Sequence, residues 1–548
     1  MPLGPHVTKE RSSWAAPGDV NAFFGLMLDN IADLLLTVSL LSAVFGFPTE
    51  FALTHMVPGT AIGVLIGDLY FFWMALKLAQ RTGGKSITSM PLGLDTPSTF
   101  GMVFFVLGPT FAAAKAAGLS VEESAIRTWH VGICAIFVSG LFKLICAFGS
   151  AWIRRVVPRA GLLGSLTSIS LVIICFMPLV EFFHEPVVGL TALAIILTTL
   201  VARVPVPFKV PGAVAALLVG GLIYYGMKLQ TVGSVAELFS DPHQPFEPAA
   251  GLLPTAWLEA FGFGWTKMLF TAEFANKLPI ILPFALATVV GGIDCTESAA
   301  AAGDEYDTGQ VIGVEAIATL IAALCGGVIQ TTPYIGHPAY KAMGGRAAYT
   351  LATALFVGSA GVLGYFGYLY LIIPKAAVYP ILVFVGLEIT AQSFHATPNR
   401  HYPAVAFACI PALAYLVIIH LDPFLPRLGE LSADDSGKVL TIRMLSANFI
   451  ITSLVWGAAL AAIIDRQLYR AAAFFAAAAV CTLFGVMHSP FAGGPVFLPW
   501  QITQETELQA VLHFAAGYMT VTVLMLAWGA YLQFVDPALR GEGLADPH

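Results

Sequence analysis

Two short stretches rich in proline and glycine interrupt the apolar segments of this chain. Residues 86–98 read SITSMPLGLDTPS, and residues 327–340 read GVIQTTPYIGHPAY. Proline and glycine at this density exclude a continuous helix. Pro97 and Pro338, however, suit the first position of a helix, where no backbone N–H is required, and Asp95 or Thr96 would cap the first of these helices. We therefore predict two extended stretches, each leading into a half-helix.

The composition places these stretches in a membrane protein. Hydrophobic residues make up 57% of the 548 residues and charged residues 11%, and the mean hydropathy is +0.81. A soluble protein carries about 25% charged residues, so this chain lacks the polar surface of a soluble enzyme. Its apolar residues also come in runs of about 20, the length that spans a hydrocarbon core.

Sixteen spans are expected along the chain. They lie near residues 20–46, 52–79, 97–114, 124–149, 160–183, 186–202, 211–227, 278–303, 310–328, 338–345, 348–372, 375–394, 402–421, 443–465, 469–487 and 508–533. The excess of Lys and Arg in alternate loops places both termini in the cytoplasm. An odd number of spans on each side of a long polar loop makes the second half enter the membrane from the opposite side, as in an inverted repeat.

The expected fold class is an all-α polytopic membrane protein. Its 14-span core consists of two inverted 7-span repeats, with spans 3 and 10 as half-helices, followed by two additional C-terminal spans. The expected segments are a cytoplasmic tail (1–19), the first repeat (20–227), an extracytoplasmic loop (228–276), the second repeat (277–466), the additional spans (467–535) and a cytoplasmic tail (536–548).

Paired half-helices in matching positions indicate a transporter site. Their N-termini carry free N–H groups and positive dipole ends, which favour a strongly hydrogen-bonding or partly anionic solute. Two proline kinks that only shape the packing are the alternative interpretation. The half-helix regions supply the candidate substrate-binding residues Asp95, Thr96, Ser98, Thr332, Tyr334 and His337.

Ionisable residues within spans are costly, so each one needs a reason. Asp294 and Glu297 are three residues apart on one helix face, and we predict that they bind substrate and carry the coupling proton. Asp29 and Asn30 are further candidate substrate-binding residues, although Asp29 and Asp33 also have the spacing of a structural pair. Asp68 and Glu315 fit hydrogen bonds between helices.

These landmarks resemble the nucleobase–cation symporter-2 superfamily, closest to the hypoxanthine/guanine/adenine permease branch. The resemblance rests on residues 294–300 and on the stretch 332–346 with its closing Gly344-Gly345-Arg346. It implies a core domain (spans 1–4 and 8–11), a gate domain (spans 5–7 and 12–14) and, in many members, a homodimer. Glu297 falls where the family keeps an acidic substrate contact, whereas Gly336 stands where purine permeases carry a second acid.

The first functional hypothesis is a secondary transporter for proton-coupled uptake of a nucleobase or related heterocycle. The alternative is a carrier of a small organic or inorganic anion on the same fold. The sequence has no nucleophile–base pair, metal-ligand spacing or phosphate-binding loop, so we expect no enzyme, no metal and no cofactor. The expected partners are a nucleobase-like solute, a proton or sodium ion and membrane lipid, without nucleic acid. The expected location is a bacterial inner membrane.

Overall fold

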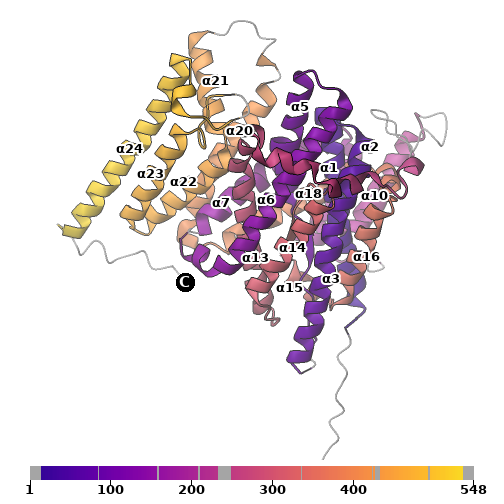
Figure 1. Ribbon diagram of the computed structural model, residues 1–548. Coiled ribbons are helices and arrows are strands. Elements are labelled where there is room, and N and C mark those ends of the chain that lie inside the picture. The colour runs from indigo at the N-terminus through magenta and orange to yellow at the C-terminus, as the bar shows by residue number, and fades with distance from the viewer. Residues whose placement is uncertain are drawn as a thin grey trace, which may run out of the picture.

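The computed structural model describes residues 14–83, 86–156, 159–207, 210–231, 248–334, 336–422, 424–425, 432–491 and 494–534, and these are almost entirely helical (Figure 1). The first half contains α1 (Gly18–Phe45), α2 (Thr49–Phe51), α3 (Val57–Arg81), β1 (Leu92–Leu94), α4 (Thr96–Gly101), α5 (Gly108–Ala116), α6 (Val121–Val156), α7 (Arg159–Ile169), α8 (Phe176–Phe182), α9 (Pro186–Ile196) and α10 (Gly212–Lys228). Three π-helical segments join neighbouring helices into longer ones: η1 (Ala52–Met56), η2 (Met102–Leu107) and η3 (Ser170–Cys175). A fourth, η4 (Leu197–Val201), extends α9.

The connection to the second half is built from short helices: η6 (Pro248–Gly251), η7 (Ala256–Gly262), η8 (Gly264–Phe270) and α12 (Ala272–Ala275). The second half contains α13 (Leu278–Ala301), α14 (Thr308–Leu324), β2 (Thr331–Pro333), α15 (His337–Ala342), α16 (Ala348–Val362), α17 (Phe366–Ile372), α18 (Lys375–His395), η9 (Asn399–His401), α19 (Tyr402–Ala408), α20 (Ile410–Leu421), α21 (Ala433–Ser446) and α22 (Phe449–Ile464). The chain continues with α23 (Leu468–Leu483), η11 (Pro499–Gln501) and α24 (Glu505–Phe534).

Many of these helices can cross a membrane. Within the described residues, nine are long and apolar enough to do so, or up to eleven when each of two bent pairs counts as one span. Four shorter apolar helices and the half-helix α15 account for the remaining predicted spans. The chain is therefore a multi-pass membrane protein, as its composition predicts.

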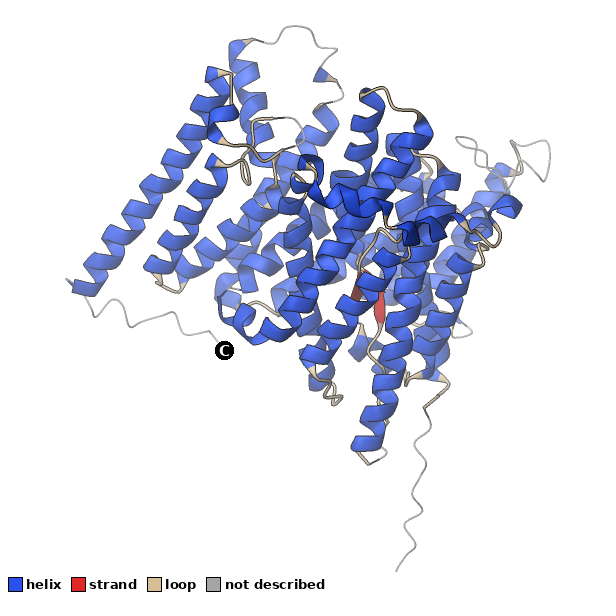
Figure 2. Cartoon of the chain, in the orientation of Figure 1, coloured by secondary structure: helices blue, strands red, loops and turns tan. Residues whose placement is uncertain are grey.

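The two extended stretches form a small antiparallel sheet among the helices, drawn in red in Figure 2. Leu92 pairs with Pro333, Gly93 with Thr332 and Leu94 with Thr331. Non-helical backbone at membrane depth must be satisfied by protein groups, and here each strand satisfies the other. Each strand leads into a helix with proline in its first turn, as predicted: α4, which continues through η2 and α5 to Ala116, and the short α15.

The packing of the helices follows the inverted repeat. In the first half, α3 precedes β1, and in the second half α14 precedes β2. The long contact of α3 with α16 is matched by that of α14 with α6, which is the same pair with the halves exchanged. Because the two strands are antiparallel, the two strand–half-helix units run in opposite directions.

The helices also divide into the predicted core group (α1–α6 and α13–α17) and gate group (α7–α10 and α18–α22). Within the core group, α3, α6, α14 and α16 make the most extensive contacts. Within the gate group, α7 packs against α22 and α19, and α18 packs against α8 and α9. Contacts between the groups, such as those of α1 with α18 and of α13 with α22, are smaller. This division agrees with the expected core and gate domains.

Two predicted spans are bent rather than straight. The predicted span 348–372 turns by 94° between α16 and α17. Gly364 makes this corner with φ +78°, and a Cβ there would lie 2.0 Å from the carbonyl oxygen of Gly251. The predicted span 443–465 contains a 74° corner between α21 and α22. There, Asn448 has φ 51° and donates to the carbonyls of Gly485 and Gly494.

The two additional C-terminal spans form a helical hairpin at one edge of the molecule. In Figure 1, α23 and α24 lie side by side at the left, and they pack closely on each other. α22 connects the hairpin to the rest of the molecule through its contact with α23. Much of α24 is apolar and exposed, including Val523, Trp528 and Phe534, as expected for a surface that faces lipid.

Candidate functional site

The first turn of α4 is surrounded by buried polar groups. Asp95 is the N-cap, and its carboxylate accepts the backbone N–H of Ser98 at 3.1 Å and the Ser98 hydroxyl. The sequence named Asp95 or Thr96 for this role, and the structure shows that Asp95 takes it. The capping carboxylate also faces the positive end of this half-helix, where a negative charge is favourable.

Gln330 connects this helix start to two neighbouring elements. Its amide nitrogen donates to the Asp95 carboxylate at 3.3 Å and to the hydroxyl of Ser98. Its amide oxygen accepts the hydroxyl of Ser139 on α6. Its backbone carbonyl accepts the N–H of Asp95 at 3.0 Å, which extends the strand pairing into the site. A single glutamine therefore joins both halves of the repeat.

The polar face of α1 lies against the same strand. Asn30 accepts the backbone N–H of Leu94 at 2.9 Å, and Asp33 accepts the hydroxyl of Thr96 at 2.9 Å. Asp29, Asn30 and Asp33 are all buried, at 5%, 0% and 0% exposure. The structure thus brings the predicted residues Asp29, Asn30, Asp95, Thr96 and Ser98 together around the junction of β1 and α4.

A buried ion pair contacts the backbone of β2. The ammonium of Lys143 on α6 lies 2.7 Å from Oε1 of Glu315 on α14 and donates to the carbonyl of Thr331 at 2.9 Å. Both side chains are fully buried. Glu315 was expected to bond between helices, and it does so to Lys143. Asp68 accepts the backbone N–H of Leu92 at 3.0 Å, so a buried acid holds β1 and a buried lysine holds β2.

His337 does not contact the polar groups at the start of α4, namely Asp95, Ser98, Ser139 and Gln330, which we call the α4 cluster. Its Nε2 is 3.1 Å from the carbonyl of Thr88 and 3.2 Å from Oδ2 of Asp304. Lys341 pairs with the other oxygen of Asp304 at 2.7 Å. Burial opposes ionisation of Asp304, but the bonds from His337 and Lys341 outweigh it and hold the pKa of this carboxyl below its usual value. His337 therefore fastens α15 to the loop after α13.

The remaining predicted residues lie on β2, just after it and on α13. Thr332 pairs with Gly93, and the backbone N–H of Tyr334 donates to Pro91 at 2.8 Å. A Cβ at Gly336 would lie 2.7 Å from the Tyr334 ring, so this ring occupies the space where an acidic side chain would begin. The side chains of Asp294 and Glu297 lie outside the described part of the structure, although the backbone of α13 is described.

The cavity beside the α4 cluster is very small. Ser98, Ser139 and Gln330 line it together with Phe284 and other apolar residues, and its volume is about 20 Å³. This volume holds about one water molecule. The polar groups therefore face each other in a closed arrangement, and a larger solute requires α13 or the gate helices to move.

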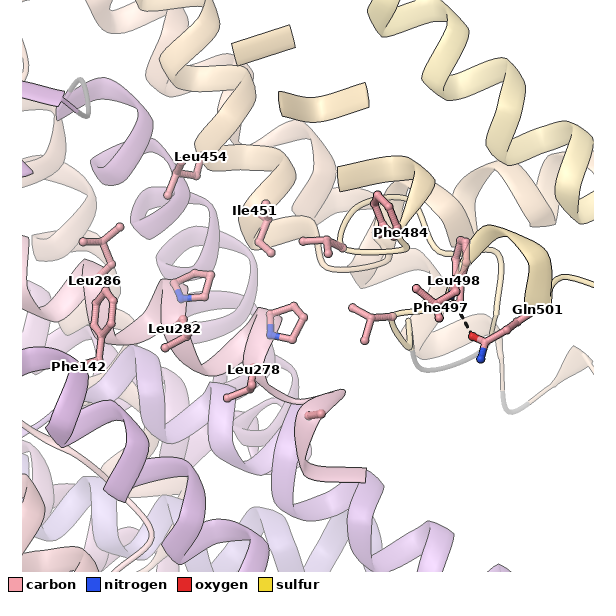
Figure 3. A pocket seen from close by; sticks show the side chains of 15 residues that line it. Phe142, Leu278, Leu282, Leu286, Ile451, Leu454, Phe484, Phe497, Leu498 and Gln501 are labelled. Atoms are coloured by element: carbon pink, nitrogen blue, oxygen red, sulfur yellow. Dashed lines mark hydrogen bonds between the residues drawn. The ribbon is translucent and has the colours of Figure 1, made fainter. Parts of the chain in front are cut away.

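A much larger groove of about 670 Å³ lies elsewhere, beside the C-terminal hairpin (Figure 3). Leu278 and Leu282 of α13, Ile451 of α22 and Phe497 of the loop before α24 contribute to its wall. Gln501 is the one hydrogen-bonding side chain among its lining residues. This groove offers little to a polar solute, so it is not the candidate site.

Several residues of the site were not assigned roles from the sequence. Lys143 could have been found, because a charged residue within a span is expensive. Asp33 was named from the sequence only as a structural partner of Asp29. Gln330 and Ser139 could not, because a lone polar residue near a span gives no distinctive pattern. Within the described residues, no group of three or more His, Cys, Asp or Glu side chains could hold a metal ion.

Comparisons with known proteins concern the fold. No family model and no curated protein matches the chain. The chain is similar to the transmembrane domain of BicA, a cyanobacterium bicarbonate transporter (13% identity, TM-score 0.46, 80% of this chain and 96% of that one). It is similar to SLC26A9 (10% identity, TM-score 0.46, 94% and 91%) and to the murine Slc26a9 anion transporter in the inward-facing state (12%, 0.38, 76% and 66%). This likeness assigns no cargo, and the permease branch stays a prediction.

Proposed function

We propose that this protein is a secondary transporter that moves a small polar solute by alternating access. The observation that carries this proposal is the buried β1–β2 pair, which leads into two half-helices beside a cluster of inward-facing polar side chains. Irregular backbone inside a membrane protein is tolerated where it is enclosed by protein or lines a cavity. Discontinuous helices at the centre of an inverted repeat are the usual place for solute and ion binding.

The division of the helices supports the mechanism. Contacts are extensive within the core group and within the gate group, and smaller between them. Such an interface lets one group rock against the other around a fixed site. The small cavity at Ser98 and Gln330 then represents the closed stage, and rocking would open it to one side at a time.

The first candidate cargo is a nucleobase or related heterocycle. Such a solute presents donors and acceptors at its edge, and the Asp95 carboxylate, the Gln330 amide and the Ser139 hydroxyl supply both kinds of partner. The charge balance also disfavours an anion. Around the strands, the described carboxylates of Asp29, Asp33, Asp68, Asp95 and Glu315 face one buried ammonium, that of Lys143. An electrochemical gradient of protons or sodium would drive accumulation.

A small anion is the second candidate cargo, and the start of α15 favours it. Gly336 is the N-cap of α15 and forms no side-chain capping bond, whereas Asp95 caps α4. The first N–H groups of α15 therefore lack a capping carboxylate, and such groups attract negative charge. An anion would have to enter with a cation or proton to offset the surrounding carboxylates.

Uptake by reconstituted vesicles tests the proposal. Labelled hypoxanthine, guanine, adenine and uracil form one probe set, and bicarbonate, sulfate and a small carboxylate form the other. Accumulation of one set, lost in Gln330→Leu and retained in the exposed control Asp434→Asn, supports the proposal and identifies the cargo class. If the wild type moves neither set faster than empty vesicles, the proposal is contradicted. Unchanged uptake by Glu297→Gln would contradict the role predicted for Glu297.

We also propose that the protein lies in a bacterial inner membrane with both termini in the cytoplasm. The excess of Lys and Arg in the loops on that side supports this orientation. Reporter fusions after Phe534 and in the 228–276 loop test it. The C-terminal fusion should be active only with a cytoplasmic reporter, and the loop fusion only with a periplasmic one.

A further inference from the structure

We propose that Asp29 and Asp33 of α1 hold one proton between them and that this proton moves together with the cargo. The inference rests on the proposed transport function and assigns it a coupling site. It places the coupling proton at the junction of α1 with the strands. The sequence had predicted this proton on α13, at Glu297 and Asp294. The structure supplies three observations for this assignment.

The first observation is the geometry of the pair. Asp29 and Asp33 are four residues apart on one helix, so their side chains lie on the same face one turn apart. They are 5% and 0% exposed, and each has a buried carboxylate oxygen without a hydrogen-bond partner, Oδ2 of Asp29 and Oδ1 of Asp33. A proton shared between two such carboxyl groups would give these unpartnered oxygens a hydrogen bond.

The second observation is the charge around the pair. The groups that interact electrostatically with it are Asp95 on α4, Tyr334 after β2 and Tyr340 on α15, and Glu388 of α18 acts on the same Tyr334 hydroxyl. Within the described residues, no Lys, Arg or His forms an ion pair with Asp29 or Asp33. Lys143 is already paired with Glu315. Two buried carboxylates at this spacing without a cation cannot both be ionised at low cost, so one proton is retained.

The third observation is that hydrogen bonds connect this part of α1 to the candidate site, at β1 and the first turn of α4. Oδ2 of Asp33 accepts the Thr96 hydroxyl in the first turn of α4, and Asn30, between the two acids, accepts the N–H of Leu94 in β1. A change of charge on the pair therefore changes bonds to the strand and to the half-helix that form the candidate site. An ionised Asp33 binds the Thr96 hydroxyl more strongly than a protonated one.

The proton step is a simple transfer without redox change. When the site is open to the outside, a hydronium ion donates a proton to the pair. One O–H bond of the hydronium breaks, leaving water, and an O–H bond forms on one carboxyl oxygen of the pair. When the site is open to the inside, that O–H bond breaks and the proton returns to water. The closed pair keeps its proton and one negative charge, and it carries two negative charges only while water in the inward-open site solvates the second one. Each cycle moves one proton with the solute.

Infrared spectroscopy tests the shared proton without any cargo. A protonated carboxylic acid has a carbonyl stretching band that a carboxylate lacks. The band is read by subtracting the spectrum of each purified variant from that of the wild type at neutral pH. We expect a band that disappears in Asp29→Asn and in Asp33→Asn and remains in the exposed control Asp434→Asn. A wild-type spectrum from which neither substitution removes intensity would overturn the shared proton.

Vesicle transport tests the coupling. With the nucleobase and anion probes, an inside-alkaline gradient should drive accumulation by the wild type. Asp33→Asn should lose accumulation yet still exchange labelled for unlabelled solute at equal concentrations. Gradient-driven accumulation by Asp33→Asn at the wild-type level, or accumulation that follows sodium instead of pH, would overturn the inference. If the wild type moves no probe, the transport function itself fails, while the infrared result still decides whether the pair holds a proton.

Discussion

The ammonium of Lys143 lies 2.7 Å from the carboxylate of Glu315, at a place where neither side chain is exposed. The two residues come from α6 in the first half and α14 in the second, and Lys143 also donates to the carbonyl of Thr331 in β2. This pair therefore joins both halves of the repeat to one strand. Removing one member leaves a buried charge without its partner, which costs far more than removing both.

Lys143→Met should destabilise the protein by about 3–5 kcal/mol, because the Glu315 carboxylate would stay buried without its counter-ion. The double variant Lys143→Met/Glu315→Leu should recover most of this loss, since it removes both charges. Thermal unfolding of the purified protein in detergent gives the comparison. Equal losses in the single and the double variant would show that the pair matters for another reason.

Asp95→Ala should weaken the start of α4. The substitution removes the cap on the Ser98 N–H, which costs about 0.5–2 kcal/mol, and it also removes an acceptor from Gln330. Asp95→Asn keeps a capping oxygen and should lose less stability. If Asp95 also contacts the cargo, Asp95→Asn will lose transport while staying folded. Unfolding curves and uptake measured on the same preparations separate these effects.

His488 should make the stability of the C-terminal hairpin depend on pH. Its Nδ1 donates to the carbonyl of Met444, and its Nε2 accepts the hydroxyl of Tyr518. Burial lowers the pKa of His488 from 6.5 to about 4, and the bond to Met444 only partly opposes this. The unfolded chain then binds the extra proton, so stability should fall as pH decreases from 6.5 to about 4, by about 3 kcal/mol in total.

The variant His488→Asn tests this dependence. Asparagine tolerates the φ of 54° at this position and does not titrate in this range. Its stability between pH 4 and 6.5 should therefore change less than that of the wild type. Thermal unfolding across this range gives the slope, and an identical slope in both proteins would assign the pH dependence to other groups.

Gly364→Ala should disrupt the corner between α16 and α17. The glycine has φ +78°, and a Cβ would lie 2.0 Å from the carbonyl oxygen of Gly251, so backbone must move. Gly226→Ala on α10 is the matched control, because no atom lies within 4 Å of its Cβ position. We expect the control to gain about 0.5–1 kcal/mol and the corner variant to unfold at lower temperature. Similar unfolding temperatures would mean that the corner can shift at little cost.

The membrane class, the positions of the spans and the two half-helices could all be predicted from the sequence alone. Apolar runs of about 20 residues match the thickness of a hydrocarbon core. Pro97 and Pro338 follow stretches rich in proline and glycine, and a proline is best tolerated in the first turn of a helix. The antiparallel entry of the halves follows from counting spans. Even the capping role of Asp95 could be predicted, because a cap acts on backbone three residues away. The corners at Gly364 and Asn448 could not, because apolar patterns do not show where a span bends.

Which polar residues come into contact depends on the tertiary structure and could not be predicted. Lys143 and Glu315 are 172 positions apart, and nothing in either span indicates the other. His337 stands at a half-helix start, yet Asp304 and Thr88 hold it away from the α4 cluster. Gln330 looks ordinary in the sequence and becomes the link between Asp95, Ser98 and Ser139. Side-chain partners inside a membrane protein depend on how helices from both halves pack, and that packing is a property of the whole chain.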